Sequence, residues 1–141
     1  MHTRMKTISK LTSDVGATMI ERDIPEIGDD DILVKTLAVS VCGTDVHIYE
    51  YNRWAKSRIR LPQIMGHELA GQVVRLGKNV TSVKLGDIVS AETHIVCGEC
   101  EFCKSGNAHI CINTSILGVD RDGAFSEYVA IPAKNAWINN P

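Results

Sequence analysis

Apolar and polar residues alternate through most of the first forty positions, in three runs that are separated by turn-forming residues. The runs are MKTISK at 5–10, GATMIERDIP at 16–25 and DDDILVKTLAVSV at 29–41. Alternation with a period of two is typical of β-strands that bury one face. Pro25, Gly28 and three successive aspartates interrupt the pattern. We therefore predict three short strands joined by turns.

The stretch TDVHIYEYNRWA at 44–55 departs from this alternation and predicts one short helix. Thr44 and Asp45 are candidate N-cap residues, because their side-chain oxygens can accept from free backbone N–H groups at a helix start. Three large residues fall on one side of the predicted helix: Val46, Tyr49 and Trp54. Pro62 ends this excursion from the β pattern.

Strand patterns resume after Gly66. They comprise ELAGQVVRLG at 68–77, VKLGDIVSAETHIV at 83–96 after a GKNV turn, and GAFSEYVAIPAKNAW at 123–137. A cysteine-rich segment with little apolar periodicity separates the last two. The patterns predict one mainly β domain that carries two inserted elements, a short helix and a cysteine-rich lobe.

Composition narrows the classes of protein that fit this domain. The 141 residues are 44% hydrophobic with a formal net charge of −2, which describes an ordinary soluble domain and excludes a disordered chain. No apolar run is long enough to span a membrane, and the polar N-terminal residues do not resemble a signal peptide. We therefore predict a cytoplasmic protein, in which the glycosylation-like motifs at Asn79 and Asn113 occur by chance.

The segment CGECEFCKSGNAHIC holds four of the five cysteines, with the spacing C-x2-C-x2-C-x7-C. They are Cys97, Cys100, Cys103 and Cys111. In a reducing compartment this spacing favours a metal site over disulfides, and four thiolates complete a closed tetrahedral zinc site. Such a site is structural, and it replaces the hydrophobic core that the lobe lacks. Gly98 and Gly106 permit its tight turns. Alternatives are an iron–sulfur cluster, unligated thiols, and His109 as a competing nitrogen ligand.

The fifth cysteine, Cys42, ends a predicted strand, and His67 and Glu68 follow in the motif GHE. Cysteine, histidine and a carboxylate are three ligands that zinc accepts. Three is also the number that a catalytic zinc takes from protein while it keeps a position open. Each signal is weak when taken alone, since a single cysteine is more often a core residue than a ligand.

Four stretches of the chain together resemble the zinc-dependent medium-chain alcohol dehydrogenases. They are CGTDVHIYEYNRWA, IMGHELAGQVVRLGKNV, GDIVSAETHIVCGECEFCKSGNAHIC and GVDRDGAFSEYVAIPA. The resemblance covers nearly the whole chain. It implies a GroES-like, partly open β-barrel over residues 1–141, with the structural-zinc lobe at about 94–113.

The resemblance also implies roles for individual residues. Cys42, His67 and Glu68 would bind a catalytic zinc, which with the structural zinc makes two per chain. Thr44 and His47 would pass a proton outward, and helix positions three apart do share a face. His94 would lie near the substrate, although a purely structural role is the alternative. Asp45 would support the turn.

Within the family, the CGTDVHIY, NRWA and ETHIVCGEC stretches resemble the branch that oxidises L-threonine with NAD. This branch implies a small-molecule substrate and a homotetramer for the whole enzyme. A zinc-dependent polyol or diol dehydrogenase of the same family is the alternative, because a few pocket residues decide substrate choice.

The family has a second, dinucleotide-binding domain, but this chain contains neither a G-x-G-x-x-G motif nor a βαβ pattern. We therefore expect the chain to be the N-terminal catalytic domain of a longer protein. NAD would be bound by the missing domain, and this chain alone would be inactive.

Two other classes of function compete with the enzyme. A zinc-stabilised GroES-like interaction module would explain the barrel and the lobe, but it has no need of Cys42, His67 and Glu68 beside Thr44. A nucleic-acid-binding zinc module is suggested by the basic stretch RWAKSRIR at 53–60, but the acidic net charge disfavours it.

Overall fold

The computed structural model describes residues 3–139 as three antiparallel sheets with short helices between them. The five-stranded sheet has the order β10-β6-β5-β3-β9, the three-stranded sheet the order β2-β1-β4, and β7 pairs with β8. The strands are β1 Arg4–Lys10, β2 Thr18–Asp23, β3 Asp31–Ser40, β4 Gln63–Ile64, β5 Glu68–Leu76, β6 Ile88–Ala91, β7 His94–Ile95, β8 Ser115–Ile116, β9 Tyr128–Pro132 and β10 Ala136–Ile138.

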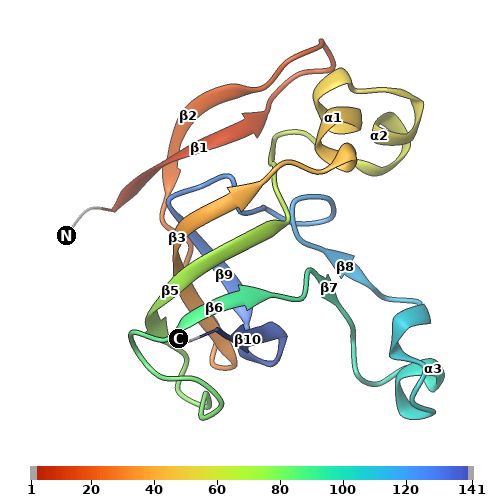
Figure 1. The fold of residues 1–141 in the computed structure, drawn as a ribbon. Helices are drawn as coiled ribbons and strands as arrows, with labels where there is room; N and C mark the ends of the chain where they lie inside the picture. The colour runs from red at the N-terminus through yellow and green to blue at the C-terminus, as the bar shows by residue number, and fades with distance from the viewer. Residues whose placement is uncertain (1–2, 140–141) are drawn as a thin grey trace.

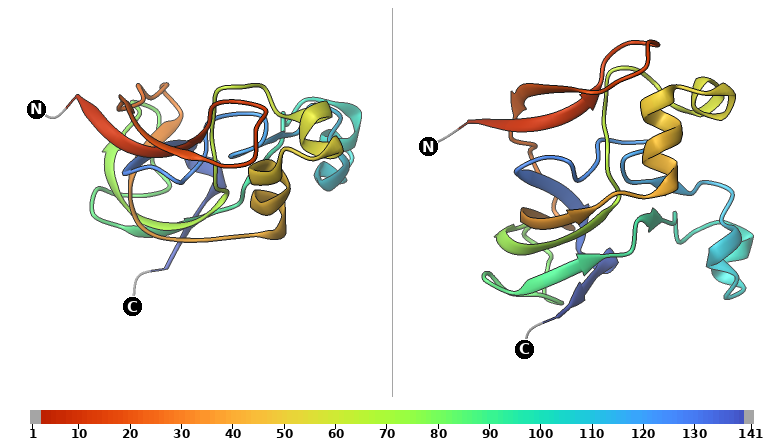
Figure 2. Two further views of the ribbon diagram at one scale, coloured as in Figure 1. Left: turned by 90° about the horizontal axis from the view of Figure 1, so that it is seen from above. Right: turned by 45° about the horizontal axis from the view of Figure 1, so that its top comes forward.

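The helices are short, and α1, α2 and α3 lie on one side of the strongly curved sheets (Figure 1). They are α1 Gly43–Glu50, α2 Arg53–Arg58, α3 Glu101–Lys104 and the 3-10 turns η1 Ala108–Ile110 and η2 Ala133–Asn135. Figure 2 shows that α3 lies at the end of an extension which leaves the barrel through β7 and returns through β8. The mainly β architecture with two inserted elements is therefore confirmed.

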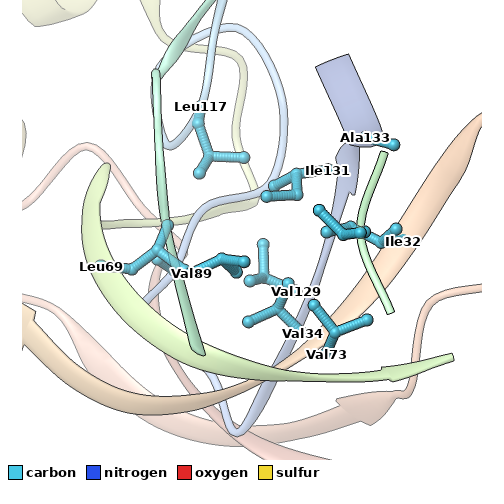
Figure 3. Packing of buried hydrophobic residues seen from close by; sticks show 11 residues of the cluster. Ile32, Val34, Leu69, Val73, Val89, Leu117, Val129, Ile131 and Ala133 are labelled. Atoms are coloured by element: carbon cyan, nitrogen blue, oxygen red, sulfur yellow. The ribbon is translucent and has the colours of Figure 1, made fainter. Parts of the chain in front are cut away.

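The core fills the inside of the curved five-stranded sheet (Figure 3). Its members are aliphatic residues of alternating strand positions and of the loops that close over them: Ile32, Val34, Leu69, Val73, Val83, Val89, Leu117, Ala124, Val129, Ile131 and Ala133. β3 and β5 pair along most of their length, from Ile32 opposite Leu76 to Ser40 opposite Glu68. This long ladder fixes which residues emerge at the helix-bearing end of the barrel.

The prediction of one helix over 44–55 is wrong in its length and in its N-cap. The helix is broken at Tyr51, which adopts the left-handed conformation (φ 50°), so α2 starts anew. The N-cap of α1 is Cys42 rather than Thr44 or Asp45.

The predicted apolar side of this helix is also wrong. Its three large residues, Val46, Tyr49 and Trp54, are exposed, and Ile48 and Ala55 are buried instead. Ile48 and Ala55 pack with Ile59, Met65 and Val119 in a second core cluster beneath the two helices.

The strand predictions hold better. The strands expected within 5–10, 16–25, 29–41 and 68–77 are all present. The run at 83–96 yields only β6 and β7, because a turn at Gly86 (φ 91°) precedes the first and a loop separates the two. The run at 123–137 is interrupted by η2 after Pro132. Within the described residues, no helix is long and apolar enough to cross a membrane.

Candidate metal centres

The four cysteines of the lobe converge on one point, although they come from a loop, α3 and the residue after η1. Their sulfurs all lie within 4.8 Å of one another. The Sγ of Cys97 is 4.0 Å from that of Cys103 and 3.5 Å from that of Cys111. A tetrahedron with Zn–S bonds of about 2.3 Å places its sulfurs about 3.8 Å apart. The cluster therefore fits a zinc ion, and all four are free thiols rather than disulfides.

Backbone hydrogen bonds in the lobe favour the thiolate form of one of these cysteines. Hydrogen bonds from the backbone N–H groups of Glu99 and Cys100 lower the pKa of the Cys97 thiol to about 6. Desolvation raises the pKa of the Cys103 thiol to about 12. Four thiolates with their sulfurs within 4.8 Å of one another repel, so the cluster favours a cation that compensates their charge. Gly98 and Gly106 have φ of 80° and 83°, so the turns of the lobe need the freedom of glycine.

The second candidate centre joins three residues that are brought together by the barrel. Cys42 follows β3, His67 precedes β5 and Glu68 is the first residue of β5. Their ligand atoms lie within 4.8 Å of one another. The β3–β5 register places Ser40 opposite Glu68, and the Ser40 hydroxyl donates a hydrogen bond to the Glu68 carboxylate. The ladder thus fixes one donor directly, and sequence reasoning missed Ser40 because its partner is 28 residues away.

The buried side chain of Asp45 holds the two backbone segments that carry these donors. Its side chain is 2% exposed and accepts hydrogen bonds from the backbone N–H of Cys42 at 2.9 Å and of Gly66 at 3.2 Å. Its Oδ1 is 3.8 Å from Nδ1 of His67, which is beyond hydrogen-bond distance, and this Nδ1 is a buried atom without a hydrogen-bond partner among the described residues. With Nδ1 directed at a buried carboxylate, Nε2 is the nitrogen that can bind a metal. Asp45 therefore ties both ligand segments together, in addition to supporting the turn at the start of α1.

Cysteine sulfur, imidazole nitrogen and carboxylate oxygen are all zinc donors, and three of them leave a coordination position open. The centre opens into a cleft of about 630 Å³. Besides the three donors, its wall includes Thr44, Trp54, Glu92, His94, Ile116 and Val119. The arrangement can therefore hold a zinc ion at the end of a cavity that is large enough for a small substrate.

Only one of the two residues of the predicted proton path lines the cleft. Thr44 lines the cleft, and its Oγ1 lies 3.8 Å from the Sγ of Cys42. His47 is exposed and is not among the described residues that line the cleft. Its ring contacts the ring of Trp54, and Trp54 does line the cleft. His47 is thus connected to the cleft only indirectly in this chain.

His94 lies on the cleft wall and is oriented by Glu92. The Oε1 atom of Glu92 accepts from the backbone N–H of His94 at 2.9 Å and from its Nδ1 at 3.0 Å. These hydrogen bonds lower the pKa of the Glu92 carboxyl. Since a carboxylate only accepts, the proton of a neutral His94 lies on Nδ1, and Nε2 carries a lone pair.

The far wall of the cleft is fixed by an ion pair that sequence reasoning also missed. Arg58 donates two hydrogen bonds of 2.7 Å to Asp120, which also accepts from the backbone N–H of Ile116 at 2.9 Å. Burial works to raise the pKa of the Asp120 carboxyl, but these bonds outweigh it and lower the pKa. One cation of the basic stretch at 53–60 is therefore neutralised. His109 is exposed and does not belong to the four-cysteine cluster.

Comparison with known proteins assigns the family. The family described as "Alcohol dehydrogenase GroES-like domain" matches residues 28–140. L-threonine 3-dehydrogenase from Caldanaerobacter subterraneus subsp. tengcongensis is 60% identical over 136 residues, which are 96% of this chain and 39% of that protein.

Two solved structures have the same fold. A zinc-binding dehydrogenase from Sinorhizobium meliloti 1021 bound to NADP matches with a TM-score of 0.87 and 34% identity, covering 97% of this chain and 39% of that one. The cobalt- and zinc-bound thermostable alcohol dehydrogenase from Pyrobaculum aerophilum matches with a TM-score of 0.86 and 27% identity, covering 98% of this chain and 42% of that one.

The chain thus spans about two fifths of the length of the proteins it matches. The GroES-like fold predicted from the motifs is confirmed, and the chain belongs to the alcohol dehydrogenase GroES-like domain family.

Proposed function

We propose that this chain is the catalytic domain of a zinc-dependent dehydrogenase that oxidises the 3-hydroxyl of L-threonine to 2-amino-3-oxobutanoate, with NAD as hydride acceptor. The observation that carries the proposal is the open three-donor centre of Cys42, His67 and Glu68 at the end of a cleft. A GroES-like interaction module would have no use for such a centre. The relatives named L-threonine 3-dehydrogenase support the choice of substrate.

In this proposal Cys42, His67 and Glu68 hold one zinc and the four cysteines of the lobe hold a second. A zinc ion in the first centre supplies a Lewis acid that makes a coordinated hydroxyl more acidic. Thr44 lies on the cleft wall beside Cys42, where its hydroxyl can accept the proton that the substrate loses. His47 then passes this proton outward.

NAD would supply the acceptor for the hydride and its two electrons from C3 of the substrate, so that the alcohol would become a ketone. No dinucleotide fingerprint occurs in the sequence, and we therefore assign NAD binding to a further domain and expect this chain alone to be inactive. His94 contacts the substrate through its Nε2 lone pair, since Nδ1 is engaged by Glu92. A homotetramer and a cytoplasmic location remain predictions for the whole enzyme.

The first test is the zinc content of the purified chain by elemental analysis. We expect two zinc ions in the wild type. The variant Cys42→Ser should retain one and stay folded, whereas Cys103→Ser should destabilise the lobe. A wild type that binds only one zinc ion, with the same content in Cys42→Ser, would contradict a zinc centre in the cleft of this chain.

The second test concerns the reaction. The chain is joined to the remaining segment of the 60% identical relative, and kcat/KM is measured with NAD for L-threonine and for 2,3-butanediol. We expect preference for L-threonine, and loss of activity in Cys42→Ser. A preference for the diol would favour the polyol or diol alternative, and an inactive but zinc-replete chimera would favour the interaction module.

A further inference from the structure

Asn52 lies between the two helices that flank the cleft and binds both of them. It is the N-cap of α2, where its Oδ1 accepts from the backbone N–H of Ala55 at 3.1 Å. Its Nδ2 lies 2.8 Å from Nδ1 of His47 in α1. Its backbone N–H also donates to the carbonyl oxygen of His47 at 3.2 Å. One side chain therefore connects the cap of α2 to the imidazole of His47.

These contacts determine which way the amide of Asn52 faces. The backbone N–H of Ala55 can only donate, so the amide atom that faces it must be the oxygen. The NH₂ group then faces His47. An amide NH₂ only donates, and Nδ1 of His47 must therefore present its lone pair. A neutral imidazole with an unprotonated Nδ1 carries its proton on Nε2.

The surrounding residues hold this arrangement in place. Tyr51, with its left-handed backbone, sets the turn that brings Asn52 beside His47. The fully buried Lys10 anchors this turn, because its Nζ donates to the carbonyl oxygen of Tyr49 at 2.7 Å and lies 5.5 Å from the centre of the Tyr51 ring. On the other side the ring of Trp54 meets the His47 ring edge to face, with centroids 6.3 Å apart.

We propose that Asn52 is a positioning residue that holds neutral His47 in the Nε2–H tautomer. The two histidines near the cleft then have opposite roles, since Glu92 holds His94 with its proton on Nδ1. His47 donates from Nε2, and it can take up a proton only at Nδ1. The proton can enter there only after the contact with Asn52 opens, and the proton on Nε2 can then leave.

In this tautomer Nδ1 of His47 is occupied by Asn52, so the proposed proton path is closed until the two side chains move apart. This role rests on the proposed dehydrogenase function. The Nδ1–H form of His47 would place an N–H against the NH₂ of Asn52. After the Nε2 proton has left, the ring carries its proton on Nδ1, and it returns to the resting form when Nδ1 releases this proton and Nε2 of the exposed imidazole takes one from water. A flip of the amide does not relieve this constraint, because it would place the NH₂ against the N–H of Ala55.

The test is ¹⁵N–¹H correlation spectroscopy of the zinc-loaded chain labelled in its histidine rings, with His47→Gln used to assign the signals. In the wild type we expect Nδ1 of His47 at a pyridine-like shift and Nε2 at a pyrrole-like shift. In Asn52→Asp the cap oxygen remains but an acceptor replaces the NH₂. There we expect Nδ1 to become protonated, either in the inverted tautomer or in the imidazolium form.

Asn52→Ser is the matched control, because serine also caps a helix but is too short to reach His47. It should leave α2 folded and give a mixture of the two tautomers. An Nδ1–H tautomer in the wild type, or a pattern unchanged in Asn52→Asp, would overturn the proposal. The measurement involves no turnover, so this result would leave the proposed dehydrogenase function intact.

Discussion

Substitution of Asp45 by asparagine should weaken zinc binding at the cleft centre and leave zinc binding at the lobe unchanged. The carboxylate is buried and accepts from the backbone N–H groups of Cys42 and Gly66, and it faces Nδ1 of His67. Asparagine has nearly the same shape but only one acceptor atom. In either orientation its NH₂ group therefore confronts one of the two backbone donors.

The size of the effect follows from these contacts. A hydrogen bond to a charged group contributes about 1.5–3 kcal/mol, and a buried donor left without a partner costs about 1–3 kcal/mol. We therefore expect Asp45→Asn to lower the free energy of unfolding by about 3 kcal/mol. Removal of a partner that orients a ligating histidine weakens metal binding by about ten- to hundredfold. The cleft zinc should lose affinity by this factor.

The assay is competition of the folded chain with a chromophoric zinc chelator, which resolves the two sites by affinity. The lobe zinc serves as the internal control, because none of the hydrogen bonds of Asp45 reaches the lobe. Asp23→Asn, at an exposed carboxylate, is the control for surface charge. If Asp45→Asn bound its cleft zinc as tightly as the wild type, the argument that Asp45 orients the ligands would be refuted.

Three further substitutions test the scaffold, each by urea unfolding. Lys10→Met removes the donor to three carbonyl oxygens and should cost about 3 kcal/mol, whereas the exposed Lys35→Met should change stability by less than about 0.5 kcal/mol. Gly66→Ala should cost about 3 kcal/mol, because φ is 87° and the added Cβ would lie 2.2 Å from the Phe125 ring. Because the pKa of the Asp120 carboxyl is lowered from its ordinary value of 3.8, its ionised form stabilises the fold above pH 3.8. This contribution to stability is lost as the pH falls from 3.8 through the lowered pKa. Asp120→Asn should therefore destabilise the chain at pH 7 but differ less from the wild type at about pH 2.

The two centres were predicted from different kinds of sequence signal. The four lobe cysteines lie within fifteen positions, so the spacing alone indicated that they converge. The two parts of the cleft centre are 25 positions apart, and the resemblance to the dehydrogenases was needed to join them. The β3–β5 ladder supplies the physical reason, since it brings the end of one strand to the start of the other.

The residues that hold the donors could not be predicted in the same way. Ser40 and Asp120 act on partners 28 and 62 positions away, and only the folded barrel brings these pairs together. The predicted helix was left undivided because a tyrosine gives no sequence signal for a left-handed turn. Asn52 did carry a local signal, since asparagine before RWA is a favourable N-cap. Recognition of this cap would have divided the helix correctly.

The two centres therefore depend on different physical interactions. Between Cys97 and Cys111 only Cys111 is buried among the described residues, so the lobe has almost no apolar core of its own and needs a metal to compensate its thiolates. The cleft donors are held by the long β ladder and by the buried Asp45, whose hydrogen bonds join protein groups only. A preformed open centre costs little reorganisation when substrate enters, whereas a centre that folds with its ion must remain closed. This difference in support agrees with our proposal that catalysis takes place at the cleft centre and that the lobe centre stabilises the fold.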